Sequence, residues 1–150
     1  MKKIVLAALL LSVIPGRIEA QEEDVRQLMT RFVAALQDAD WPAFRACWVE
    51  HPVMYSPTEM TRFDDGSFDA EWQRAFQQIR QTAATRGITT APYVKVDPQE
   101  MRIDFPSPTV AVITFHLTDN NRPRRRMFVA ARTDAGWKLA NLDSSDLSGR

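Results

Sequence analysis

The sequence is poor in the residues from which metal centres and disulfides are built. It has one cysteine, Cys47, and two histidines, His51 and His116. A single cysteine excludes an internal disulfide and a cysteine-rich metal site. Two histidines exclude a three-histidine site, although a mixed histidine and aspartate site stays open. The chain also lacks a phosphate-binding glycine loop and a dinucleotide fingerprint, so we expect neither a metal nor another cofactor.

A surplus of positive charge is also missing. The 19 basic and 19 acidic residues give a formal net charge of +0. Nucleic-acid-binding domains usually have a basic surplus, so we expect no nucleic-acid partner. The longest apolar run, Ile4–Ile14, is too short to span a bilayer. The sequence therefore predicts no membrane anchor.

The first residues have the layout of a secretory signal peptide. Met1–Lys3 is basic, Ile4–Ile14 is apolar, and Ala20 offers a small residue before a cut at Gln21. We expect residues 1–20 to be the signal and residues 21–150 to form a single domain, periplasmic or secreted. Removal of the signal would leave a formal net charge of −2, because it takes away three basic residues and one acidic residue.

Helical periodicity dominates the first half of the mature chain. Apolar residues from Val25 to Leu36 recur at helical spacing, and so do those of a helix from about Asp69 to Arg86. Asp40 can cap a short helix, with Pro42 in its first turn, that places Phe44, Cys47 and Trp48 inward and stops before Pro52. Two short strands are predicted in this half, at Val53–Ser56 and Thr61–Phe63.

The period changes to two in the second half, which is typical of strands. The predicted strands are Tyr93–Ile103, Thr109–Thr118, Arg124–Thr133 and Trp137–Leu142, and a turn is expected at Phe105–Pro108. Helices followed by a meander of antiparallel strands predict an α+β fold.

This order of elements resembles the nuclear transport factor 2-like superfamily, in particular its bacterial polyketide-cyclase-like and ketosteroid-isomerase-like members. The resemblance covers residues 23–146 and rests on three segments: Phe32–Leu36 leading to Asp38–Trp41, the strand at Val53–Ser56, and the closing Gly136–Ser145. It implies a cone-shaped, curved antiparallel sheet packed against two to three helices from the N-terminal half. It also implies a homodimer formed through the outer face of the sheet. Function does not follow from this fold, which contains enzymes and binding proteins alike.

The aromatic residues favour a binding pocket. In the fold that the resemblance implies, some of these rings would line a cavity between the sheet and the helices, which is the default site for a small ligand. The leading hypothesis is an exported domain that binds a small apolar or amphipathic molecule. The predicted ligand-binding residues are Trp48, Tyr55, Phe63, Trp72, Phe76, Phe115, Arg124 and Arg126.

The two arginines in that set come from the densest charge run, Arg122–Arg126. In a strand, Arg124 and Arg126 point to one side and Arg125 to the other. The run can be a solvated hairpin whose charges discourage edge pairing. Alternatively, one arginine at the mouth of a cavity can receive a carboxylate or phosphate.

Acid–base catalysis is the second hypothesis, with Tyr55, His116 and Asp143 as the candidate catalytic residues. If they share the concave face of the sheet, they supply a phenol, an imidazole and a carboxylate for an isomerase, hydrolase or cyclase. Strand parity argues against His116, because it alternates with the bulkier set Ala111, Ile113, Phe115 and Leu117. A dimeric protein-interaction module is the third hypothesis.

Overall fold

The computed structural model of the chain describes residues 15–55, 60–62, 66–119 and 122–146. Phe63 of the predicted ligand-binding set lies outside these residues. Within them, no helix has the length and apolar character needed to cross a membrane. The same residues contain no group of three or more His, Cys, Asp or Glu side chains that could hold a metal ion.

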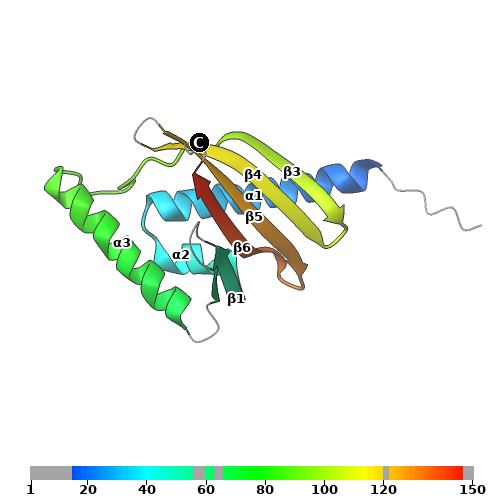
Figure 1. Ribbon diagram of the computed structural model, residues 1–150, viewed down its shortest axis with the longest axis horizontal. Coiled ribbons are helices and arrows are strands. Elements are labelled where there is room, and N and C mark those ends of the chain that lie inside the picture. The colour runs from blue at the N-terminus through cyan, green and yellow to red at the C-terminus, as the bar shows by residue number, and fades with distance from the viewer. Residues whose placement is uncertain (1–14, 56–59, 63–65, 120–121, 147–150) are drawn as a thin grey trace, which may run out of the picture.

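Three helices and one sheet form the described fold (Figure 1). The helices are α1 (Pro15–Gln37), α2 (Trp41–Ala46) and α3 (Ser67–Thr85). The strands are β1 (Trp48–Tyr55), β2 (Met60–Arg62), β3 (Gln99–Ser107), β4 (Val110–Asp119), β5 (Arg122–Thr133) and β6 (Gly136–Asp146). The order in the sheet is β2-β1-β6-β5-β4-β3, with β1 and β6 parallel and the other pairs antiparallel. The predicted α+β class and the curved sheet are confirmed.

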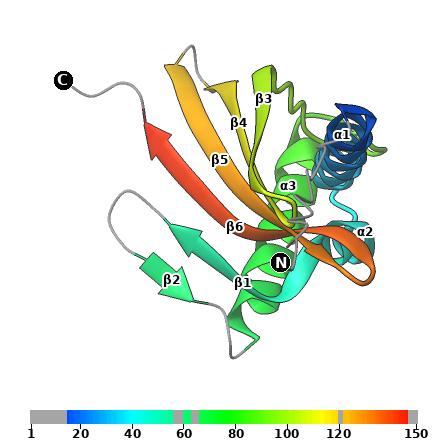
Figure 2. The same ribbon diagram turned by 90° about the vertical axis from the view of Figure 1, so that its right-hand side faces the viewer.

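The helices cover one face of the sheet, which we call the inner face (Figure 2). Alternation along β4 shows which residues belong to it, because Ala111, Ile113 and Phe115 are buried in the core. The predicted parity of this strand is therefore confirmed. The opposite side is the outer face, and no described helix covers it.

Local chemistry explains how α2 begins. Asp40 has extended backbone angles, and its side-chain oxygen accepts a hydrogen bond from the Ala43 N–H, while Pro42 occupies the first turn. The predicted cap is thus confirmed. The short helix presents Phe44 to the core, where it is completely buried.

Two proline-containing segments differ from the prediction. The first strand begins at Trp48 rather than Val53 and passes through Pro52, at a point where its register with β6 shifts. Phe105–Pro108 is not a turn, because β3 continues to Ser107. A proline has no N–H to donate, so it fits where a ladder is interrupted or at the edge of a sheet, and β3 is an edge strand.

The predicted strand at Tyr93–Ile103 is wrong in its first half. Strand β3 begins at Gln99, and the preceding residues pair with a helix instead of with β4. The N–H groups of Tyr93 and Val94 both donate to the Gln37 carbonyl at the end of α1. These hydrogen bonds satisfy both backbone donors without a strand partner. They also hold residues 93–97, which we call the rib, against the end of α1.

Candidate functional site

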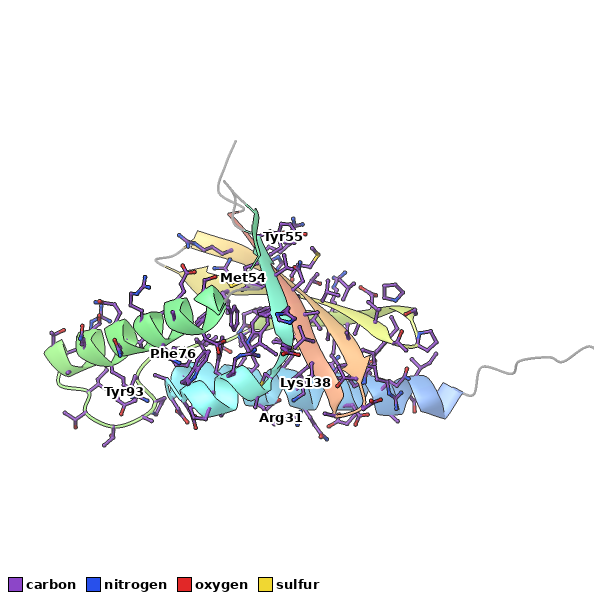
Figure 3. The ribbon with its side chains drawn as sticks, turned by 90° about the horizontal axis from the view of Figure 1, so that it is seen from below. Arg31, Met54, Tyr55, Phe76, Tyr93 and Lys138 are labelled. Carbon is purple, nitrogen blue, oxygen red and sulfur yellow. The ribbon has the colours of Figure 1, made fainter. Side chains whose placement is uncertain are left out.

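Aromatic rings fill the inner face near α2, α3 and β1. Phe44 lies at their centre, with ring contacts between 4.5 and 6.4 Å to Phe32, Trp41, Trp48, Phe68, Trp72 and Phe76. Figure 3 shows Phe76 and Met54, which face this interior from α3 and β1. The Trp72 indole N–H donates to the Met54 sulfur at 3.4 Å, which links the helix to the strand.

Four residues of the predicted ligand-binding set belong to this packed region. Trp48, Phe76 and Phe115 are buried, and Trp72 is half-buried against the same cluster. Trp48 and Trp72 contact the Phe44 ring, Trp72 also contacts Phe76, and Phe115 stacks on Phe128. They therefore form the apolar floor of the fold. The cluster and the fold together suggest a ligand-binding domain, and hollows are found beside the cluster.

The inner face changes character toward the end of the hairpin formed by β4 and β5. Phe128 on β5 stacks on Phe115 of β4, with ring centroids 5.7 Å apart. Two residues before Phe128 in β5, Arg126 pairs with Phe115 of β4. Arg124, two residues earlier still, pairs with Leu117. Because paired residues point to the same side of a sheet, both arginines lie on the inner face. The predicted division of Arg124 and Arg126 from Arg125 is confirmed.

A cavity of about 660 Å³ lies at this end of the sheet, and we call it the hairpin groove. It is lined by Val94, Lys95, Val96, Asp97, Gln99, Leu117, Thr118 and Arg126. Valine and leucine side chains supply apolar surface, while Lys95 and Arg126 supply positive charge. The lining is about half polar and half apolar, so a molecule with both kinds of surface can be accommodated there.

The wall of the hairpin groove is held by two residues from different helices. The Gln37 side chain of α1 donates to the Val96 carbonyl at 3.3 Å, in addition to the two backbone bonds that its own carbonyl accepts. Arg80 of α3 donates to the Ala39 carbonyl at 2.6 Å, and its guanidinium lies 6.0 Å from the Tyr93 ring centroid. The rib is thus fixed to both long helices before a ligand arrives.

Two smaller hollows flank the rib. The α3 groove, of about 170 Å³, is lined by Gln78, Ile79, Thr82, Ala83, Arg86, Tyr93 and Val94. The α1 groove, of about 420 Å³, is lined by Arg26, Met29, Thr30, Val33, Ala34, Gln37, Pro98 and Met101. Val94 lines both the hairpin groove and the α3 groove.

The candidate catalytic residues lie on the outer face. Tyr55 pairs with Asp143 across β1 and β6, and both alternate with residues of the core, Met54 and Leu142. The structure therefore brings the phenol and the carboxylate onto neighbouring strands, with Tyr55 38% exposed. They do not share the helix-covered concave face on which the catalytic hypothesis placed them.

His116 also lies on the outer face, but two strands away from Asp143. It pairs with Arg125 of β5, which in turn pairs with Ser145 of β6. Two strand spacings amount to about 10 Å, too far for a direct hydrogen bond. The imidazole Nδ1 instead lies 3.5 Å from the Glu100 carboxylate, and the side chain is 39% exposed. A catalytic role for the three residues stays a prediction.

Cys47 is buried, and its thiol donates to the Ala43 carbonyl at 3.4 Å. Burial raises the pKa of this thiol, while the charges of Arg31 and Lys138 oppose that rise (Figure 3). A raised pKa leaves little thiolate at neutral pH. Cys47 therefore serves as a packing residue.

Comparison of the sequence with known protein families identifies the family of this chain. The sequence profile of the SnoaL-like domain matches residues 18–143, which include nearly all of α1, the other two helices and the sheet as far as Asp143 of β6. The chain belongs to the SnoaL-like family. No curated protein matches it in sequence.

Solved structures agree with the SnoaL-like assignment. A nuclear transport factor 2-like protein with a cystatin-like fold from Novosphingobium aromaticivorans matches with a TM-score of 0.70 at 15% identity, covering 97% of this chain and 94% of that one. A proposed dehydratase of the same family from Streptomyces avermitilis matches at 0.67 and 13% identity, covering 87% and 99%. A proposed ketosteroid isomerase from Shewanella frigidimarina matches at 0.63 and 14%, covering 83% and 97%. At such identities the likeness shows the fold alone, and the predicted superfamily is confirmed.

Most of the hairpin groove is not predicted by the sequence. The predicted ligand-binding set includes Arg126 but none of Val94, Lys95 or Leu117, because the sequence pattern predicts a strand at residues 93–97. The available signal was weak: the alternation from Tyr93 onward is interrupted by Pro98. Gln37 was missed as well, since a glutamine at the end of a helix has no distinctive pattern.

Proposed function

We propose that this domain binds a small amphipathic anion in the hairpin groove. The observation that carries the proposal is the placement of Arg126 on the inner face, beside the aromatic floor and at a cavity of about 660 Å³. A cation next to apolar surface suits a ligand that has both an acidic group and an apolar body. Guanidinium groups bind carboxylates and phosphates through several parallel hydrogen bonds.

Lys95 adds a second positive charge from the rib, and Asp97 adds one negative charge. The two cationic side chains favour an anion over a cationic ligand. The preformed rib supports binding without a large rearrangement, because little ordering has to accompany the ligand.

A fluorescent amphipathic anion tests the proposal. Anilinonaphthalene sulfonate is titrated into the folded domain and its dissociation constant is measured for the native protein, R126Q and R125Q. We expect R126Q to weaken binding about tenfold, the worth of one charge-assisted hydrogen bond. R125Q removes the same charge from the same strand but on the outer face, and should leave the dissociation constant unchanged.

Equal weakening by both variants would indicate that only general electrostatic attraction is at work, and would overturn the proposal. Circular dichroism and a thermal melt of each variant establish that the fluorescence does not come from partly unfolded protein.

Assembly through the outer face is a second candidate function. Val112, Met127 and Val129 lie on that face, half-buried, and no described helix covers them. We propose that two copies of the chain pair there. Light scattering coupled to size exclusion should give a dimer for the native chain and a monomer for M127D, and a native monomer at high concentration would contradict the proposal.

We also propose that the protein is exported, on the basis of the basic and apolar start of the chain. Expression of the full sequence with its own N-terminus, followed by recovery of the periplasm and intact-mass analysis, should give a chain that begins at Gln21. A full-length mass in the cytoplasmic fraction would contradict export.

A further inference from the structure

The hairpin groove and the α3 groove share one exposed apolar side chain. Val94 lines both hollows and is 36% exposed. Its backbone N–H donates to the Gln37 carbonyl at 3.4 Å, so its place on the rib is held by the backbone and not by its side chain. An apolar side chain between two hollows offers a continuous surface to a ligand that reaches from one to the other.

The two hollows differ in size and chemistry. The hairpin groove has about 660 Å³ and the cations Lys95 and Arg126. The α3 groove has about 170 Å³, with Ile79, Ala83 and the Tyr93 ring as its apolar surface. A volume this small admits an alkyl chain more readily than a fused ring system. Arg86 lines it as well, and the methylene stem of an arginine can cover apolar surface while its charged end stays in water.

The charges in the hairpin groove select among acidic head groups. Lys95 and Arg126 supply two cationic groups to the groove, and Asp97 supplies a carboxylate. A carboxylate head carries one negative charge and can pair with either cation, whereas a phosphate that carries two negative charges would meet stronger repulsion from the Asp97 carboxylate.

We propose that the ligand is an elongated carboxylate with a single charge and an unbranched alkyl chain. Its head lies at Arg126 and Lys95 in the hairpin groove, and its chain crosses Val94 into the α3 groove. This inference rests on the proposed function, since it names the ligand class of the same site. It adds a second contact region, on α3, that binding of a compact anion would not use.

A chain-length series tests the proposal. Calorimetric titrations with butanoate, octanoate, dodecanoate and hexadecanoate, each below its micelle concentration, give the dissociation constant as a function of length. Each methylene that becomes buried should lower it about twofold to fourfold, until the α3 groove is filled and longer chains bring no further gain. Dodecyltrimethylammonium, which has the same chain and the opposite charge, should bind at least tenfold more weakly than dodecanoate.

Two matched variants locate the chain. V94D places a charge where the chain would cross, and should weaken dodecanoate about tenfold more than it weakens butanoate, which meets the added charge through its head group alone. I88D is the control, because Ile88 is 39% exposed, lies in the same connection between α3 and β3, and lines none of the three hollows described above. V94A, a milder change, should reduce the gain per methylene without introducing a charge.

The outcomes separate this inference from the function on which it rests. A dissociation constant that is independent of chain length, or equal effects of V94D and I88D, would overturn the extended ligand, and the anion site at Arg126 would still stand if R126Q weakens anilinonaphthalene sulfonate. If R126Q and R125Q weaken that probe equally, the proposed function fails, whatever the chain-length series shows.

Discussion

The two ends of the inner face differ in their side chains, although both are built on the same sheet. One end is packed with aromatic rings, and the other has charged side chains beside a groove. Near α2 and β1 the face is filled by rings, with Phe44 fully buried among six aromatic neighbours. Near the hairpin of β4 and β5, Arg126 and Leu117 replace the rings and a hollow of about 660 Å³ remains. The rings stabilise one end of the fold, and the other end contains the hairpin groove, where we propose that the ligand binds.

The position of the rib explains the difference. At the filled end, helices pack directly on the sheet and large side chains meet between them. At the hairpin end the cover is a single irregular segment, held by Gln37 and Arg80. The hairpin groove is lined by this segment and by residues of β3, β4 and β5.

The largest loss of stability is expected for F44A. Removal of a fully buried ring leaves a cavity among six aromatic neighbours and should lower the free energy of unfolding by about 3–5 kcal/mol. L117A, at the other end of the same face, should cost clearly less because Leu117 is only half-buried. Urea denaturation of both variants measures the difference, and equal losses would show that the two ends are packed alike.

R45A should have the next largest effect. The Arg45 guanidinium donates to the Asp69 carboxylate at 2.8 Å and to the Val49 and Glu50 carbonyls at 2.8 and 2.9 Å, which ties α2, β1 and α3 together. Its loss should lower the free energy of unfolding by about 1–3 kcal/mol. R74A removes an exposed arginine of α3 and should change stability by less than about 0.5 kcal/mol. A loss in R74A as large as in R45A would rule out the anchoring role.

Q37A should lower the local stability of residues 93–97 but not that of the aromatic cluster around Phe44. It removes the side-chain bond to the Val96 carbonyl and should cost about 1 kcal/mol. Hydrogen exchange should become faster in residues 93–97 and stay unchanged around Phe44. Q27A, on the exposed side of α1, is the control. Uniform acceleration across the chain would mean that Gln37 supports global stability rather than the rib.

The smallest expected effect is the contribution of Cys47 to the pH dependence of stability. Its thiol pKa is raised in the folded state by burial, so the unfolded chain loses this proton at a lower pH than the folded chain does. The resulting stability is fully present below about pH 8.5, the pKa of a thiol in an unfolded chain, and declines as the pH rises above it. C47A should lack this decline in melts between neutral and alkaline pH. Identical pH profiles for the two proteins would show that the thiol does not contribute.

Much of the fold could be predicted because the signals are local. The Asp40 cap, the helical stripe before Gln37 and the alternation in β4 each depend on neighbours within a few residues. The same alternation placed Arg124 and Arg126 opposite Arg125. The errors fall where long-range pairing overrides local pattern: Pro52 and Pro106 lie inside strands because of where those strands sit in the sheet.

The sequence by itself determined the α+β class, the family resemblance, the core parity of β4 and the division of Arg124 and Arg126 from Arg125, since periodicity and side-chain size specify these. Only the tertiary structure decided that the rings pack against one another, that Tyr55 and Asp143 meet on the outer face, and that residues 93–97 cross the end of the sheet as a rib. The physical reason is that the Tyr93 and Val94 N–H groups have two possible sets of acceptors, a neighbouring strand or the end of α1. That choice depends on the three-dimensional position of Gln37, a residue more than fifty positions away along the chain.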